Sequence, residues 1–257
     1  ENARLYEEEK VLLLIEEDLR VARDIQLNLL PKSNPNIPGY DVAGRSTPAK
    51  EVGGDYYDFI SMDEPRIALT LGDISGKGMP AALLMSNLQA TLRGQTRFST
   101  SSGQCLKRSN KLLYESTDVQ KFATLFYGML NYEKHEFTYS KAGHDPAFFY
   151  QKKQGMRRLE TGGTILGFRE DSEFEEETLH LEMGDLLVVY SDGITEAMNN
   201  ERDEEFGEER LEELISANLE LPSKKLIEQI FKEVRTFTQD TPQSDDMTLL
   251  VIQRSGS

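Results

Sequence analysis

Acidic residues flanked by glycine or serine recur in four short segments of this 257-residue chain. The segments are Gly53-Gly54-Asp55, Gly72-Asp73-Ile74-Ser75-Gly76-Lys77-Gly78, Ser191-Asp192-Gly193 and Ser244-Asp245-Asp246-Met247-Thr248. Carboxylate oxygens suit hard divalent ions such as Mg²⁺ and Mn²⁺, whereas zinc sites normally recruit His or Cys. The chain has only three His and one Cys. The residue types therefore predict a magnesium or manganese site with oxygen ligands.

Most of these segments stand at the end of an apolar run that is typical of a β-strand. An Asp at such a position directs its carboxylate into the crevice at the sheet edge, where residues far apart in sequence can converge. Taken alone, an Asp in a glycine-flanked turn, such as Asp73, is more often a turn or helix-cap residue. The metal site is therefore predicted from the four segments together.

Short strands interrupted by two pairs of helices are the elements that would position these segments. Hydrophobic patterning predicts strands at residues 40–47, 55–60, 66–71, 121–132, 136–140, 146–151, 185–190 and 247–252. Helices are predicted at residues 1–30, 79–95, 103–117, 208–218 and 223–239. This order is typical of an α+β domain in which helices cover two antiparallel sheets.

The N-terminal helix carries a heptad stripe. Its two rows are Leu5, Leu12, Leu19 and Gln26, and, three positions later, Ile15, Ala22 and Leu29. The stripe favours a coiled coil that forms a homodimer or transmits a signal, and the alternative is a helix that lies on its own domain. Because Pro31 ends the helix, we predict a helical linker at residues 1–30 and a second unit at residues 31–257.

Composition excludes several classes of partner. The formal net charge of −16 argues against nucleic acid and favours a protein partner. Cys105 alone cannot form an intrachain disulfide, which is compatible with a reducing cytoplasm, and no run approaches the roughly 20 apolar residues that cross a bilayer. Because Glu1 already lies inside a helical pattern, we expect a longer polypeptide with an upstream sensor module, whose membrane anchoring is left open.

Six segments of the chain carry a resemblance to a known family. They are Ala22-Arg23-Asp24-Ile25-Gln26 with Leu29-Leu30-Pro31, Val52-Gly53-Gly54-Asp55-Tyr56-Tyr57-Asp58, Gly72-Asp73-Ile74-Ser75-Gly76-Lys77-Gly78, Ala142-Gly143-His144, Ser191-Asp192-Gly193 and Asp245-Asp246-Met247-Thr248. Through them the chain from about Gln26 to Ile252 resembles the metal-dependent protein serine/threonine phosphatases of type 2C. Within these it is similar to the bacterial branch of sporulation and stress signalling. The resemblance implies an α-β-β-α sandwich, with the phosphatase domain at residues 31–257.

The resemblance also implies a site with two Mn²⁺ or Mg²⁺ ions. Asp73 would bridge them, the Ile74 carbonyl would complete one shell, and Asp55, Asp192 and Asp245 would fill the other. Asp55, Asp73 and Asp192 are thus the implied catalytic residues. Two such ions lower the pKa of a shared water, and the resulting hydroxide attacks phosphorus in line with the departing seryl or threonyl oxygen. In the bacterial branch the phosphoprotein substrate is an anti-sigma-factor antagonist, whose dephosphorylation releases a sigma factor.

Several residues keep two interpretations at this stage. Either Asp245 or Asp246 could be the ligand, and the family pattern aligns the first of the pair with it. Asp58 either supports the site or faces solvent from a strand. His144 is a general acid or, as we favour, a structural residue at a turn, and Lys77 is a phosphate contact or a solvated loop residue.

Two other functions compete with a phosphatase. The first is a catalytically silent module that keeps the fold to bind a partner, although all the expected Asp residues are present. The second is another two-metal phosphohydrolase or a nuclease, which the acidic composition disfavours. Eukaryotic members bind substrate phosphate through an Arg ahead of the first acidic motif. The nearest basic residues here, Arg45 and Lys50, do not match that context.

Overall fold

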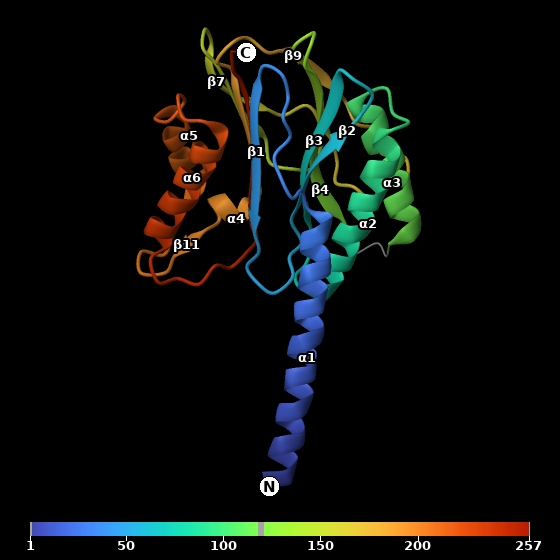
Figure 1. The fold of residues 1–257 in the computed structure, drawn as a ribbon, viewed down its shortest axis with the longest axis vertical. Helices are drawn as coiled ribbons and strands as arrows, with labels where there is room; N and C mark the ends of the chain where they lie inside the picture. Colours follow the sequence, from blue (N-terminus) through green and yellow to red (C-terminus); the bar gives the residue numbers. More distant parts are fainter. Residues whose placement is uncertain (1, 118–120, 257) are drawn as a thin grey trace.

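The computed structural model describes residues 2–117 and 121–256. Glu1 and Ser257, the outer residues of the two predicted units, lie outside the described part. Two β-sheets form the centre of the molecule (Figure 1). Sheet A has the order β1 (Tyr40–Thr47), β13 (Met247–Arg254), β10 (Leu186–Tyr190), β6 (Ala147–Gln151) and β7 (Gly155–Leu159). Sheet B has the order β2 (Tyr56–Ser61), β3 (Arg66–Ile74), β4 (Ala123–Asn131), β5 (Glu136–Ala142) and β8 (Gly162–Gly163), and β9 (Glu177–His180) also pairs with β5.

Helices cover the outer face of each sheet, so the molecule has four layers. Sheet B is covered by α2 (Met79–Thr96) and α3 (Ser102–Ser116), and sheet A by α5 (Gly207–Ser216) and α6 (Ser223–Thr238) (Figure 1). The remaining elements are α1 (Asn2–Leu29), α4 (Asp192–Thr195), β11 (Met198–Asn199) and β12 (Glu204–Glu205). The type 2C α-β-β-α sandwich is therefore confirmed.

The largest apolar cluster lies between the two sheets. Leu69 and Phe126 of sheet B pack there with Leu187 and Leu250 of sheet A, all nearly inaccessible to solvent. Each such side chain contributes roughly 1.5–3 kcal/mol when it is fully buried. This central layer therefore fixes the two sheets relative to each other, and with them the loops at their common edge.

The elements differ from the sequence prediction mainly in sheet B. The pairing of β5 with β8 is parallel, so sheet B is mixed rather than purely antiparallel. The strands β7, β8 and β9 were not predicted. These strands are short and carry glycine or charged residues, so their hydrophobic pattern is weak.

Helix α1 extends away from the body of the molecule (Figure 1). Apolar side chains of its predicted stripe stay exposed, including Leu12 at 60% and Ile15 at 50%. Only the last turns reach the domain, where Gln26 is buried. Among the described helices, none has both the length and the apolar composition needed to cross a membrane.

Candidate metal site

The four acidic segments meet at one edge of the two sheets. Asp55 directly precedes β2, and Asp73 is the next-to-last residue of the neighbouring β3. Asp192 begins α4 directly after β10, while Asp245 and Asp246 precede β13. Because β2 and β3 pair antiparallel, as do β10 and β13, each sheet brings two of the segments to the same edge. The site is thus shared between sheet A and sheet B.

The carboxylates are close enough to repel one another. Burial, together with the charges of Asp192 and Asp245, raises the pKa of Asp73 from 3.8 to about 7. Burial first, and then the charge of Asp73, raise the pKa of Asp55 well above its ordinary value. Burial and the charge of Asp245 also raise the pKa of Asp192. Such clustered negative charge is stabilised by a bound cation.

Two hydroxyl groups hold the buried Asp55 in place. Its Oδ2 accepts a hydrogen bond from Ser191 Oγ at 2.7 Å and another from Thr248 Oγ1 at 2.5 Å. Ser191 and Thr248 belong to sheet A segments, whereas Asp55 leads into sheet B. These bonds orient one carboxylate oxygen and connect the two sheets. Sequence analysis did not select either hydroxyl, although each stands one or two residues from a candidate ligand.

Asp245 and Asp246 occupy different surroundings. Asp246 Oδ1 accepts the Ala49 N–H at 2.8 Å, and Asp246 Oδ2 accepts the Gly54 N–H at 2.6 Å. Asp246 therefore anchors the loop that leads to Asp55. Asp245 Oδ2 instead pairs with Lys77 Nζ at 2.7 Å, at the partly exposed rim of the site.

The donor set fits Mn²⁺ or Mg²⁺ in chemistry. All candidate side chains offer carboxylate oxygens, and no group of three or more His, Cys, Asp or Glu within the described residues is already placed to hold an ion. Two glycines let the backbone segments of the site approach closely. A Cβ on Gly54 would lie 3.0 Å from the Ile74 carbonyl oxygen, and a Cβ on Gly193 would lie 2.1 Å from the Asp246 carbonyl oxygen. The residues present are therefore compatible with these ions in the chemistry of their donor atoms.

Basic residues near the site are few. Lys50 and Lys77 line a small hollow together with Gly53, Gly54 and Asp245. The Arg45 guanidinium instead lies 4.5 Å from the centre of the Phe231 ring, in the layer between sheet A and α6. Of the three basic residues considered in the sequence, Lys50 and Lys77 therefore line this hollow, and Arg45 does not.

Asp58 does not face solvent, which excludes one of its two sequence interpretations. It is 1% exposed and forms two hydrogen bonds with Arg93, from Nε at 2.7 Å and from Nη2 at 3.1 Å. Tyr56 OH also donates to it at 2.7 Å. Asp58 therefore attaches β2 to α2, which neither of its two sequence interpretations anticipated.

The N-terminal helix contacts the site through one side chain. Gln26 Nε2 donates to the Gly53 carbonyl at 2.6 Å, and the Gly53 N–H donates to Gln26 Oε1 at 3.0 Å. Gly53 lies two residues before Asp55. The amide of Gln26 thus holds the same loop that Asp246 holds from the other side.

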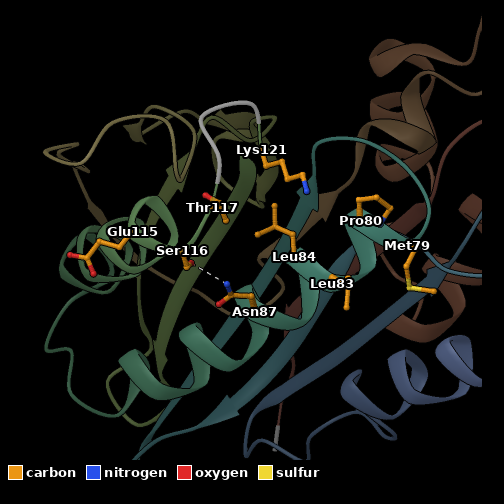
Figure 2. A pocket seen from close by; sticks show the side chains of 9 residues that line it. All are labelled: Met79, Pro80, Leu83, Leu84, Asn87, Glu115, Ser116, Thr117 and Lys121. Carbon is orange, nitrogen blue, oxygen red and sulfur yellow. Dashed lines mark hydrogen bonds between the residues drawn. The ribbon is translucent and has the colours of Figure 1, made fainter.

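A separate groove lies between the start of α2 and the end of α3 (Figure 2). Leu83 and Leu84 line it together with Glu115 and Lys121. None of the described residues that line it is one of the candidate ligands. We therefore assign it no part in the chemistry of the site.

Comparisons with known proteins agree on one family. The model of the family described as Stage II sporulation protein E (SpoIIE) matches residues 63–255. Phosphoserine phosphatase RsbU of Bacillus subtilis is 34% identical over 256 residues, which are 97% of this chain and 75% of RsbU. Protein IcfG of Synechocystis is 28% identical over 93% of this chain and 42% of its own length. Phosphoserine phosphatase RsbP of Bacillus subtilis is 25% identical over 69% of this chain and 45% of its own length.

Solved structures share the fold. The SiaA-PP2C domain of Pseudomonas aeruginosa superimposes with a TM-score of 0.83 at 17% identity, over 95% of this chain and 98% of that one. The RsbU and RsbW domains of Rv1364c from Mycobacterium tuberculosis give a TM-score of 0.73 at 27% identity, over 89% of this chain and 63% of that one. RsbX in complex with magnesium gives a TM-score of 0.62 at 16% identity, over 86% of this chain and 98% of that one.

Proposed function

Because this chain belongs to the SpoIIE family, we propose that it is a metal-dependent protein phosphatase that hydrolyses phosphoserine or phosphothreonine on a partner protein. The observation that carries the proposal is the meeting of acidic segments from both sheets at one edge, where the pKa of Asp73 is raised to about 7. An enzyme that neutralises a phosphoryl group with metal ions needs such a concentration of carboxylates. The magnesium complex of the similarly folded RsbX supports the choice of ion.

We assign the ligands from the surroundings of each carboxylate. Asp73 would serve both ions and the Ile74 carbonyl one of them, with Asp55, Asp192 and Asp245 as the other ligands. Asp246 has both oxygens engaged by backbone N–H groups, so we assign it to holding the loop and not to a metal. Two Mn²⁺ or Mg²⁺ ions, when bound, would supply positive charge against the phosphoryl oxygens and lower the pKa of a water molecule.

The chain's own residues would orient the reaction. Ser191 and Thr248 fix one oxygen of Asp55, which leaves its second oxygen free to accept from water or to bind metal. Lys77 and Lys50, around the small hollow, would attract the anionic phosphoprotein. His144 is buried, and both of its ring nitrogens are hydrogen-bonded to protein atoms, so we exclude it as the general acid.

The substrate and the partners are proposals that extend the family assignment. RsbU and RsbP are phosphoserine phosphatases by name, and the resemblance to the stress-signalling branch supports an anti-sigma-factor antagonist as the phosphoprotein. We propose that residues 1–30 link the phosphatase domain, residues 31–257, to an upstream sensor. The exposed apolar side chains of α1 support a homodimer through this segment. A cytoplasmic location stays a prediction from composition.

Phosphate release from a phosphoserine protein, measured with and without Mn²⁺, tests the function. We expect release that requires Mn²⁺ or Mg²⁺, stops with chelator, and is lost in Asp73→Asn. Turnover that persists after exhaustive removal of metal would contradict the proposal. A protein that binds the phosphoprotein without releasing phosphate would be the silent binding module, and cleavage of a phosphodiester in place of the phosphoprotein would indicate a nuclease.

A further inference from the structure

His144 lies in the connection between the two sheets. Sheet B strand β5 ends at Ala142, and sheet A strand β6 begins at Ala147, so the intervening residues cross from one sheet to the other. The crossing starts with Gly143, whose φ of 62° favours glycine, and whose N–H donates to the Gly163 carbonyl at 2.9 Å. The backbone is therefore fixed directly before His144.

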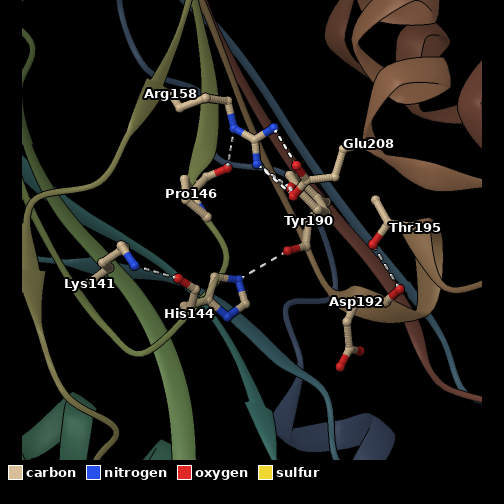
Figure 3. Close-up of polar contacts among 8 residues, drawn as sticks. All are labelled: Lys141, His144, Pro146, Arg158, Tyr190, Asp192, Thr195 and Glu208. Atoms are coloured by element: carbon tan, nitrogen blue, oxygen red, sulfur yellow. Dashed lines mark hydrogen bonds and ion pairs between the residues drawn. The ribbon is translucent and has the colours of Figure 1, made fainter.

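Both ring nitrogens of His144 are hydrogen-bonded, and each partner belongs to a different sheet. Nε2 lies 3.0 Å from the carbonyl oxygen of Tyr190 in β10 (Figure 3). Nδ1 lies 3.0 Å from Thr124 Oγ1 in β4. A carbonyl oxygen only accepts, so Nε2 carries the proton and Nδ1 accepts from the threonine hydroxyl. Burial lowers the pKa of His144 to about 4, which keeps this neutral tautomer at physiological pH.

The two partners of His144 stand next to candidate ligands. Thr124 lies opposite Asp73 in the pairing of β3 with β4. Tyr190 is the last residue of β10 and precedes Asp192 by two positions (Figure 3). The imidazole ring therefore spans the sheets at the edge where Asp73 of sheet B must meet Asp192 of sheet A.

The atoms around the ring are also held. Lys141 Nζ donates to the His144 carbonyl at 2.9 Å, and Arg158 Nε donates to the Pro146 carbonyl at 3.1 Å (Figure 3). His144 is 3% exposed. A planar ring with two fixed partners in such a setting behaves as a rigid spacer.

We infer that His144 is a positioning residue that sets the separation of Asp73 and Asp192 by bridging Thr124 in sheet B and Tyr190 in sheet A. This inference rests on the proposed function, in which both carboxylates bind metal. Metal–ligand distances tolerate deviations of about 0.2 Å, and a misplacement of about 1 Å in an active site can cost on the order of a hundredfold in rate. A change in the bridge should therefore weaken metal binding before it unfolds the protein.

Thr124→Val and Thr70→Val form a matched pair that tests the inference. Each substitution removes one threonine hydroxyl from the paired strands β3 and β4. Thr124 bonds to His144, whereas Thr70 donates to the Phe126 carbonyl at 2.9 Å in the middle of the sheet. Both variants should lose a similar, small part of the unfolding free energy, because each loses one hydrogen bond. Only Thr124→Val should bind Mn²⁺ more weakly in calorimetry, by roughly tenfold, the lower end of the loss seen when a group that supports a metal ligand is removed.

His144→Gln completes the experiment, because its amide can reach only one of the two partners. We expect Mn²⁺ affinity at least as weak as in Thr124→Val, together with loss of the Nε2-protonated signal in a long-range ¹⁵N spectrum of the histidine side chains. Equal Mn²⁺ affinity in Thr124→Val, Thr70→Val and the parent would overturn the inference even if His144→Gln fails to fold. Because calorimetry needs no turnover, absent phosphate release would count only against the proposed function.

Discussion

Asp73 lies within the acidic cluster, and its replacement by Asn gives a quantitative test of how burial and the neighbouring charges destabilise its ionised form. Its pKa rises from 3.8 to about 7 through burial and the charges of Asp192 and Asp245. A carboxyl group with a raised folded-state pKa contributes stability that is fully present below the unfolded pKa and is lost as the pH rises through the folded one. In chelator, the parent should therefore lose unfolding free energy between about pH 4 and pH 7 relative to Asp73→Asn, whose amide does not ionise.

The size of the effect follows from the two pKa values. A difference of one pKa unit corresponds to about 1.4 kcal/mol, so the change from 3.8 to about 7 sets an upper bound of roughly 4 kcal/mol at pH 8. The charges of Asp73 and Asp55 repel each other, so the titration of Asp55 accounts for part of this energy. The contributions of distant titratable groups cancel in the difference between parent and variant, because both proteins contain the same distant groups.

Urea unfolding monitored by circular dichroism, in chelator at pH 5 and pH 8, measures this difference. We expect Asp73→Asn to be more stable than the parent at both pH values, with the larger difference at pH 8, because by pH 5 the parent has lost only part of the stability that its raised pKa costs. Saturating Mn²⁺ at pH 8 should reverse the order, because the parent binds the ion more tightly. A parent that is as stable as the variant at pH 8 in chelator would refute the electrostatic account of the site.

Three further predictions concern the site and the N-terminal helix. Asp192→Asn should stay folded by circular dichroism while phosphate release falls on the order of a hundredfold or more; near-parental turnover would remove Asp192 from the ligand set. Gln26→Leu leaves the buried N–H and carbonyl of Gly53 without partners, so unfolding free energy should fall by about 1–3 kcal/mol in urea titrations, and an unchanged value would mean that water replaces the amide. Serine at Leu12, Ile15 and Leu19 should convert a dimer to a monomer in sedimentation and alter phosphate release; a parent that is already monomeric would leave α1 without this role.

Local patterns were sufficient to predict the layered fold. Residues 40–47 form β1 with the predicted bounds, and the two helical pairs differ from their predicted bounds by at most two residues. The parallel pairing of β8 with β5 was not predictable, since Gly162 and Gly163 have no side chains to show a pattern. The backbone of β8 packs closely against that of β5, and this requires glycine. A Cβ on Gly162 would lie 2.0 Å from the Lys141 carbonyl oxygen.

The site was predictable in its residue types but not in how the roles divide among them. Asp245 and Asp246 are adjacent and chemically identical, and only the backbone N–H groups of Ala49 and Gly54, remote in sequence, distinguish them. Asp58 stands within a recognisable motif but pairs with Arg93 on a helix whose orientation the sequence does not reveal. Long-range partners of this kind follow from the packing of elements and leave no local periodicity.

The interior position of β13 in sheet A has a consequence for synthesis. β13 pairs with β1 on one side and β10 on the other, yet it follows them in the chain. At roughly 5–20 residues per second, the ribosome needs on the order of 10–40 s to proceed from β1 to β13. During that time the edge of β1 that will receive β13 stays unpaired, and such edges attract other chains. Since Asp245 is made just before β13, the proposed ligand set is complete only when this aggregation-prone edge is about to close.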